Sequence, residues 1–404
     1  RIEGLKGAGQ VAYGPHPVGA VINYITPPVP GDRAGRLVAS FGNKDFREIH
    51  GQVGDTFGQT GFIAHGTYKE TDGARENMHF EVGDINLKAV HELSEQQAVT
   101  VRASYYDETS QVTYSGLTLA EWQADPYQNP FRNDEMDAQR FGTSVTHRFA
   151  LSPAVTFTTN AYYTYFNRDW WRQSSNSAQR PNDASDPVCA GMANLLTTCG
   201  NEGRLRQFWT AGLEPRVSMQ HGLFGVDNVA EAGIRYHFED QFRIQANGDT
   251  PSARDPGTGR NAGIREDSDR TVEAMSAFVQ NRFDFGRWTV TPGVRFEHVD
   301  YERTDNLTGA TGESTVDEVI PGIGATFEAL PETVLFAGVH RGFAPPGVAD
   351  IVTAAGGSVD LDAELSWNYE LGVRANPRDG LSYEVTLFRM DFENQIVPAS
   401  VAGG

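Results

Sequence analysis

The chain has 404 residues, and its 53 acidic and 33 basic residues give a formal net charge of −20 at pH 7. This charge argues against binding to nucleic acid or to an anionic membrane surface, and long solvated acidic loops would account for it. The chain is too long for a typical single soluble core, and it has no apolar run long enough to cross a membrane as a helix. Its 43 glycines, 14 tyrosines and 23 phenylalanines suit a β-rich chain with many turns.

The N-terminal stretch predicts a tightly folded loop followed by a short strand. Gly7, Gly9 and Gly14 allow backbone conformations that other residues rarely adopt. The mostly apolar run 18–25 is typical of a buried strand, and the prolines after it cannot continue a central strand. We therefore expect one domain over residues 1–30 and a second over 31–404. Because the chain starts inside this unit, we expect it to be a piece of a longer protein.

Beyond residue 35 the dominant pattern is an alternation of apolar and polar side chains. In residues 231–239 the apolar positions are Ala232, Ile234, Tyr236 and Phe238. The alternate positions are Glu231, Gly233, Arg235, His237 and Glu239. The segments 288–297 and 367–374 repeat this pattern. A second face that carries charges is wrong for the dry core of a sandwich, but it fits a strand with lipid on one side and a wet lumen on the other. The sequence therefore predicts an all-β, transmembrane antiparallel β-barrel.

About 15 strands are expected from this alternation. They lie near residues 36–42, 45–54, 61–70, 81–92, 97–108, 139–150, 154–168, 204–220, 229–240, 270–285, 287–302, 315–329, 333–342, 363–375 and 381–391. Gaps after even-numbered strands are short, and gaps after odd-numbered strands are mostly long. Long loops at one end and tight turns at the other are typical of an outer-membrane barrel. Because barrels of about 22 strands hold plugs, we expect about seven further strands beyond this chain.

Two cysteines, Cys189 and Cys199, lie in a polar segment rich in Asn, Ser and Pro. No histidine stands near them at a spacing typical of zinc sites. We therefore expect a disulfide between them, which implies an oxidising compartment such as the periplasm or the cell surface.

Motifs for catalysis are absent from the sequence. It has no Gly-x-Ser-x-Gly, no His-Glu-x-x-His and no phosphate-binding loop. Gly7 and Gly9 begin like a dinucleotide-binding loop, but Ala12 stands where the third glycine would fall. Asp360 and Asp362 could suggest calcium, although we expect them on one solvated strand face. We expect no enzyme activity, no metal site and no resident cofactor.

The N-terminal stretch also carries a family resemblance. The matching residues are Arg1, Ile2, Glu3, Gly7, Tyr13, Gly14, Gly19, Val21, Ile22, Asn23 and Thr26. Together they resemble the end of the plug domain in TonB-dependent outer-membrane receptors, although Gly4, Ala8 and Ala20 depart from the family pattern. The resemblance implies that 1–30 is the C-terminal part of a plug and that 31–404 is a partial receptor barrel.

Two further segments, 212–216 and 288–298, are similar to the ferric-citrate receptor family. Relatives in that family bind citrate carboxylates with arginines from apical loops, and the arginine fork suits such anions. The resemblance implies ligand contacts by residues in the long loops and at the strand mouths. The candidates are Arg172, Arg206, Arg270 and Arg265, with His16 and Gln10 as weaker candidates from the plug.

The implied function is import of a ferric chelate, such as ferric citrate or a similar siderophore, across the outer membrane of a Gram-negative bacterium. The implied partners are TonB with ExbB and ExbD, outer-membrane lipid and lipopolysaccharide, and the receptor would be a monomer. Two alternatives stay open. In the first, the protein is a TonB-dependent receptor for another cargo, such as another siderophore, a cobalamin or a glycan. In the second, the chain forms a passive porin-like channel, although porins carry no plug motif.

Overall fold

The computed structural model describes residues 2–5, 11–14, 21–113, 116–129, 131–172, 201–250, 252–259, 262–359 and 361–396. Its main body is a 15-stranded antiparallel sheet in which each strand pairs with the next along the chain. The strands are β3 (Ala34–Phe41), β4 (Arg47–Phe57), β5 (Thr60–Thr71), β6 (Phe80–Ser94), β7 (Gln97–Ser110), β8 (Glu135–Ser152), β9 (Val155–Arg172), β10 (Glu202–Leu223), β11 (Val226–Asn247), β12 (Gly263–Asp284), β13 (Trp288–Asp305), β14 (Ala310–Leu330), β15 (Thr333–Ala344), β16 (Glu364–Arg378) and β17 (Leu381–Glu393). The predicted all-β antiparallel fold and its 15 strands are confirmed.

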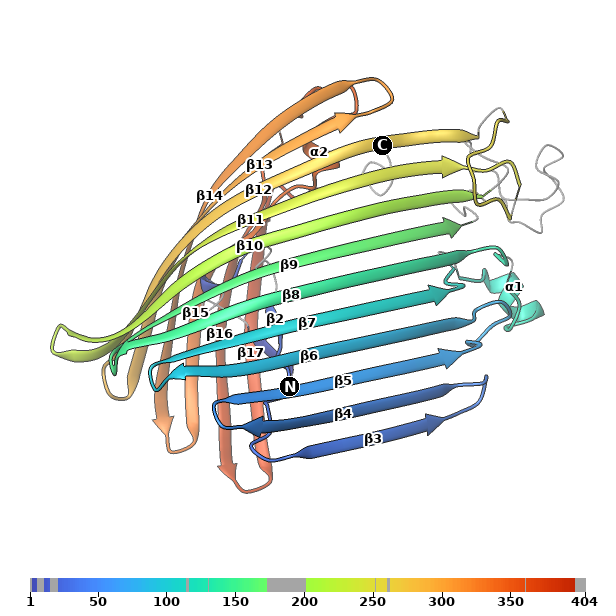
Figure 1. The fold of residues 1–404 in the computed structure, drawn as a ribbon. Helices are drawn as coiled ribbons and strands as arrows, with labels where there is room; N and C mark the ends of the chain where they lie inside the picture. Colours follow the sequence, from blue (N-terminus) through green and yellow to red (C-terminus); the bar gives the residue numbers. More distant parts are fainter. Residues whose placement is uncertain are drawn as a thin grey trace.

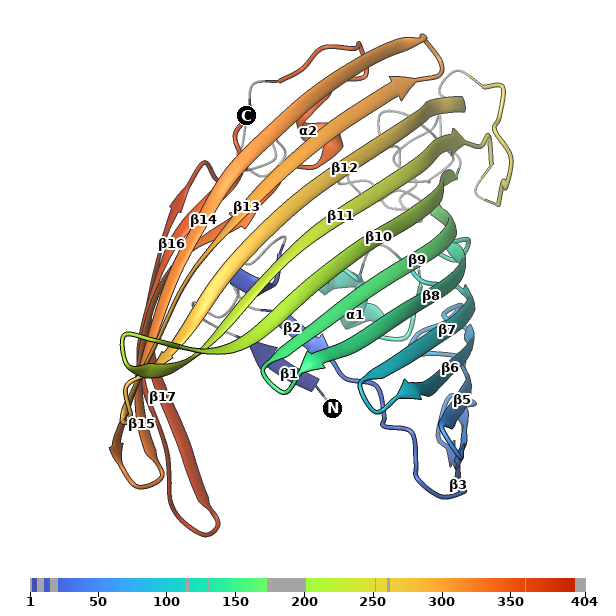
Figure 2. The same ribbon diagram turned by 60° about the vertical axis from the view of Figure 1, so that its left-hand side comes forward.

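The sheet curls strongly, so that its last strands stand across the hollow from its first strands (Figures 1 and 2). The edge strands β3 and β17 are not paired with each other, so the wall is open along one side. A small sheet of β1 (Ile2–Leu5) and β2 (Val21–Tyr24) lies on the concave side of the large one (Figure 2).

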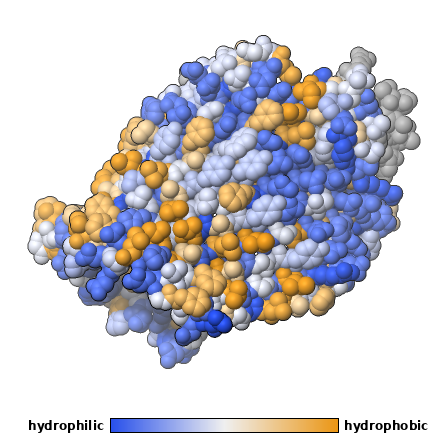
Figure 3. Space-filling view, in the orientation of Figure 1, coloured by the Kyte–Doolittle hydropathy of each residue, from blue (hydrophilic) through white to orange (hydrophobic). Residues whose placement is uncertain are grey.

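The two faces of the sheet differ as the alternation predicts. Ile234, Tyr236 and Phe296 are 55%, 42% and 44% exposed on the outer face, whereas Arg235 and His237 are half-buried on the inner face. In Figure 3 apolar residues gather across the middle and left of the outer face, and hydrophilic residues cover the end at the right. The apolar rows therefore point outwards and do not meet in a shared dry interior.

Several strands extend well beyond the apolar band. β10 and β11 have 22 residues each, about twice the 9–11 residues that a barrel strand needs to cross a membrane. Tight turns join the strands at one end, for example at Phe224 and Gly225, whose positive φ angles of 57° and 75° suit a two-residue hairpin turn. The described residues of the connections 111–134, 248–262 and 345–363 lie at the opposite end, which we call the long-loop end.

One of these connections, between β15 and β16, folds back against the inner face. It contains the short helix α2 (Val348–Ile351). A buried apolar cluster joins it to the neighbouring strands and includes Val299, Tyr301, Val316, Ile320, Phe343, Val348, Ile351, Val352, Ala363 and Leu365. Arg303 also donates a hydrogen bond to the carbonyl of Val352 at 3.2 Å. The lumen wall is therefore packed where this connection covers it, and the functional side chains stand at the border of that packed region.

Candidate functional site

Seven arginines on the inner face of β9–β13, near the long-loop end, form what we call the arginine cluster. Its members are Arg168, Arg172, Arg204, Arg206, Arg243, Arg270 and Arg303. Strand register brings them together, because Arg206 lies opposite both Arg168 and Arg243, and Arg270 lies opposite Arg303. Directly opposed residues of antiparallel strands share a face, with Cβ atoms about 4.5–5.5 Å apart.

Two carboxylates form ion pairs with these arginines in the described part of the chain. Glu266 forms an ion pair with Arg270 at 2.8 Å and longer pairs with Arg204 and Arg243, each at 3.7 Å. Glu202 pairs with Arg204 at 2.5 Å and with Arg172 at 3.2 Å. Four of the seven arginines, Arg172, Arg204, Arg243 and Arg270, share these two carboxylates. The wall at the cluster is therefore positive in a chain whose net charge is −20.

Part of the cluster lacks protein partners in the described part of the chain. Arg168 and Arg206 form no ion pair there, although Arg168 lies over the ring of Trp170. The Nε atoms of Arg168, Arg243, Arg270 and Arg303 are buried without a hydrogen-bond partner among the described residues. Buried guanidinium groups without acceptors are costly, so an anion that accepted from them would be stabilised.

Like charges also act directly on Arg206. It lies in the part of β10 beyond the 9–11 or so residues that would cross the membrane from the tight turn. Burial, and then the neighbouring charges of Arg243, Arg168 and Arg204, lower the pKa of Arg206 to about 9. The guanidinium is still protonated at neutral pH, and the charge of a bound anion would oppose both effects.

The structure brings together three of the four arginines proposed from the sequence. Arg172, Arg206 and Arg270 are members of the arginine cluster. Arg265 stands apart from the cluster. It is expected in a loop, but it lies in strand β12, where the pairing with β11 shifts register between Gln245 and Ala246. Its side chain is exposed. His16 and Gln10, and the cysteines Cys189 and Cys199 with their expected disulfide, lie outside the described residues.

The sequence reasoning missed the other four members of the cluster, Arg168, Arg204, Arg243 and Arg303. A usable signal was present, because Arg204 and Arg206 are two residues apart and Arg168 and Arg172 are four apart, and side chains at even spacing share one face of a strand. What the sequence did not give was the register that sets these strands side by side.

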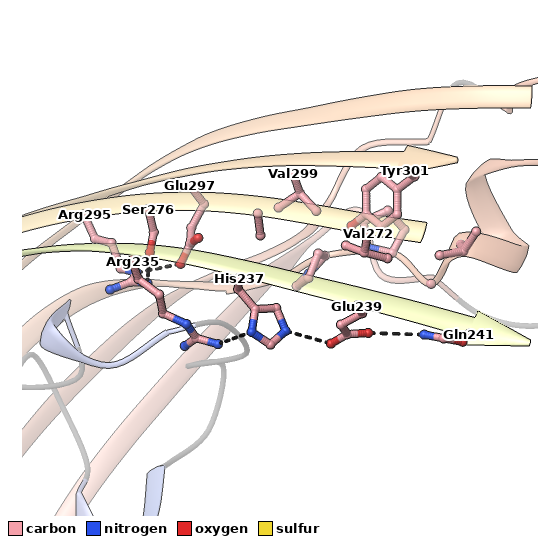
Figure 4. Close-up of a pocket in the computed structure, with 15 residues that line it drawn as sticks. Arg235, His237, Glu239, Gln241, Val272, Ser276, Arg295, Glu297, Val299 and Tyr301 are labelled. Atoms are coloured by element: carbon pink, nitrogen blue, oxygen red, sulfur yellow. Dashed lines mark hydrogen bonds and ion pairs between the residues drawn. The ribbon is translucent and has the colours of Figure 1, made fainter. Parts of the chain in front are cut away.

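A cavity of about 290 Å³ lies next to the cluster, on the side that faces the tight turns between the strands. Its wall combines apolar side chains with a row of polar ones from β11 (Figure 4). The residues around it are Arg235, His237, Glu239, Gln241, Val272, Ala274, Ser276, Arg295, Glu297, Val299, Tyr301, Pro345, Pro346, Gly347 and Val348. The last four belong to the connection between β15 and β16, which closes one side.

The row of polar side chains on β11 runs towards the N-terminal segment. Gln241 donates to Glu239 at 3.2 Å, and His237 contacts Glu239 at 2.9 Å and Arg235 at 3.3 Å. Arg235 donates in turn to the carbonyl of Gly14 at 2.9 Å. Hydrogen bonds therefore connect the border of the arginine cluster with the segment 11–14.

The two motifs that resemble the ferric-citrate receptors, 212–216 and 288–298, both contact the segment 11–14. Arg216, in the first motif, donates to the carbonyl of Ala12 at 3.0 Å. Arg295 and Glu297, in the second, form a buried ion pair at 2.6 Å. A Cβ atom at Gly14 would come within 2.5 Å of Nε of Arg295, so only glycine fits against this pair. Both motifs hold the N-terminal segment against the wall.

The chemistry available at this site is recognition of an anion. Among the described residues, no three His, Cys, Asp or Glu side chains are close enough together to hold a metal ion, and none of the helices there is long and apolar enough to cross a membrane. Guanidinium groups bind carboxylates through paired hydrogen bonds and keep their charge at neutral pH.

Comparison with known proteins gives the family. Residues 84–404 match the family described as TonB dependent receptor-like, beta-barrel. The chain belongs to this family of TonB-dependent receptors. The ferrienterobactin receptor of Escherichia coli (strain K12) is 24% identical over 443 aligned residues, which cover 100% of this chain and 57% of that receptor. The chain thus spans little more than half the length of this relative.

Solved structures of TonB-dependent receptors share the fold. The ferric citrate transporter FecA in its unliganded form superposes with a TM-score of 0.81 and 22% identity, covering 98% of this chain and 57% of that one. The ferric-catecholate import receptor Fiu from E. coli K12 superposes with a TM-score of 0.77 and 13% identity, covering 96% of this chain and 62% of that one. Members of the family are transporters rather than enzymes, and they lie in the outer membrane of Gram-negative bacteria, which locates this chain there.

Proposed function

We propose that the full-length protein is an active-transport receptor that binds a ferric chelate at the cell surface and imports it with energy delivered by TonB. The arginine cluster is the observation that carries this proposal. The seven guanidinium groups of the cluster form ion pairs with only two carboxylates, Glu202 and Glu266, in the described part of the chain. A ferric chelate rich in carboxylates, such as ferric citrate, is a compact polyanion that supplies the missing acceptors.

The proposed ligand contacts are members of the cluster whose guanidinium groups the protein satisfies only in part. Arg168 and Arg206 have no ion pair in the described part of the chain, and Arg270 and Arg303 have buried Nε atoms without acceptors there. Arg172 shares Glu202 with Arg204. Arg265, His16 and Gln10 remain proposed contacts from the mouth and the plug, with less support, because Arg265 is exposed and apart from the cluster.

The segment up to residue 30 is proposed to be the C-terminal end of the plug, and residues 31–404 part of the barrel. The hydrogen bonds from Arg216 and Arg235 to Ala12 and Gly14 support this, since they hold the segment inside the curved wall. TonB, with ExbB and ExbD, would act on an N-terminal part of the plug, and the receptor would work as a monomer among lipid and lipopolysaccharide.

A second cargo is favoured by one observation. The ferrienterobactin receptor aligns with the whole of this chain, so an enterobactin-like siderophore is the second candidate. Both cargoes are ferric chelates.

Binding by the purified full-length protein tests the proposal. We expect ferric citrate to bind, and the double substitution Arg168→Ala with Arg206→Ala to weaken binding at least tenfold, measured by isothermal titration calorimetry. Arg378→Ala, an exposed arginine by the tight turn between β16 and β17, is the matched control and should leave the affinity unchanged. Equal affinity of the double variant and the wild type would refute the assignment of the cluster.

A further inference from the structure

The cavity and the arginine cluster lie next to each other on the same face of β11, β12 and β13. Gln241 precedes Arg243 by two residues, Tyr301 precedes Arg303 by two, and Val272 follows Arg270 by two. Residues two apart on a strand share a face and lie about 7 Å apart. A ligand held by the cluster therefore has the cavity next to it, one step further into the lumen.

The chemistry of the cavity differs from that of the cluster. Val272, Ala274 and Val299 form an apolar wall on β12 and β13, and Pro345, Pro346 and Val348 face it from the connection between β15 and β16. The carboxylate of Glu297 is occupied by its buried pair with Arg295 at 2.6 Å, and Glu239 by its contact with His237 at 2.9 Å. The apolar wall and these paired groups therefore offer no binding partner to a charged group of the ligand.

One polar group beside the apolar wall lacks a partner. Tyr301 is 4% exposed, and its hydroxyl has no hydrogen-bond partner among the described residues. Because an unpaired buried hydroxyl is costly, its position in the wall of the cavity marks a place for a ligand atom that accepts or donates one hydrogen bond.

We propose that this cavity receives an apolar arm of the ferric chelate, so that the preferred cargo is a carboxylate chelate carrying a short hydrocarbon arm with a polar atom near its base, rather than ferric citrate itself. The inference rests on the proposed function, since the cluster must hold the carboxylates. The volume of about 290 Å³ equals roughly ten water molecules, which is enough for a short arm.

A matched pair of ligands tests this. The probes are ferric complexes of citrate in which one terminal carboxylate is a butylamide or a methylamide, so that the two differ only in the length of the arm. For the full-length wild-type protein we expect the butylamide complex to bind at least tenfold more tightly than the methylamide complex. Ala274→Phe, which fills the cavity, should abolish this preference and leave the affinity for ferric citrate unchanged.

Two further variants complete the test. Ala232→Phe adds the same side chain on the outer face and should keep the preference for the butyl arm. Tyr301→Phe should weaken binding of both amides about three- to tenfold, the range of one lost hydrogen bond. Retained ferric citrate binding in each variant shows that the protein has folded.

The outcomes separate the two claims. If ferric citrate binds through Arg206 but the two amides bind equally well, the cavity does not take the arm, and this inference fails while the proposed function stands. If Ala274→Phe keeps the preference for the butyl arm, the arm lies elsewhere and the inference also fails. If none of the three ferric complexes binds, the proposed function itself fails.

Discussion

At the scale of single residues, the cluster is a set of charges that the protein compensates only partly. Glu266 is shared by Arg204, Arg243 and Arg270, so each of these arginines keeps donors for another acceptor. Arg206 has no ion pair in the described part of the chain, and its pKa is lowered to about 9 by burial and by neighbouring guanidinium groups. An anionic ligand would therefore bind in competition with very few carboxylates.

Removing the shared carboxylate is the first prediction. Glu266→Gln takes away a negative charge that competes with the ligand, while its amide can still accept from Arg270. We expect the affinity for ferric citrate to rise about tenfold, or ~1.4 kcal/mol, in a calorimetric titration at low salt. Weaker binding would mean that Glu266 is needed to position the arginines.

Gly14 gives a second prediction at this scale. A methyl group there would meet the buried pair of Arg295 and Glu297 at 2.5 and 2.6 Å, and overpacking of this kind costs about 1–3 kcal/mol. We expect Gly14→Ala to loosen the segment 11–14, measured as faster limited proteolysis within it. Gly4→Ala is the control, because a Cβ atom there has nothing within 4 Å. Equal cleavage rates in both variants would contradict this packing.

At the scale of elements, the sequence predicted each of the 15 strands of the large sheet but underestimated the length of several, and it did not predict β1 (Ile2–Leu5). The alternation around Ile234 and Tyr236 was readable because lipid lies on one side and water on the other. β11 continues beyond residue 240 to Asn247. The alternation also continues there, with Phe242, Ile244 and Ala246 on the outer face, so the predicted end of this strand at residue 240 is too early.

The start of β12, residues 263–270, is mostly polar on both faces, so its hydropathy predicts a loop at Arg265. The register shift beside Arg265 depends on pairing with β11 and has no signal in one strand alone.

The candidate site was less predictable than the strands. Arg172, Arg206 and Arg270 could be proposed from local motifs. Their grouping with Arg168 and Arg303 depends on pairing between residues far apart in the chain, and so does the sharing of Glu202 and Glu266. The cavity depends on the inward fold of the connection between β15 and β16. This fold follows from packing of Ile351 and Val352 in one apolar cluster with Phe343 of β15, and it has no short-range signal in the sequence.

The packed connection supplies the third prediction. Ile351 is 1% exposed in the apolar cluster, whereas Val359, in the same connection, is 40% exposed. Ile351→Asp buries an unpaired carboxylate and should detach the connection from the wall. We expect faster amide hydrogen exchange over residues 345–352, measured by mass spectrometry, with no change in Val359→Asp. Unchanged exchange in Ile351→Asp would show that the connection is not held by this cluster.

At the scale of the whole molecule, a curved antiparallel wall separates an apolar outer face from a charged lumen. The net charge of −20 makes the positive cluster a local exception, and electrostatic attraction to it is screened by salt. As a fourth prediction, the affinity for ferric citrate should fall severalfold between 50 mM and 500 mM sodium chloride. In the double variant with Arg168→Ala and Arg206→Ala, the affinity should depend less steeply on the salt concentration. An equally steep salt dependence in this variant would mean that the anion binds elsewhere.

Uptake of iron by cells tests the central claim most directly. A strain without other receptors for ferric citrate would express the full-length protein and be supplied with citrate complexed to radioactive iron. We predict accumulation of iron that requires TonB and falls at least tenfold when Arg168 and Arg206 are both replaced by alanine, at equal receptor levels in the outer membrane. Accumulation that continues without TonB, or that is unchanged in the double variant, would contradict the account.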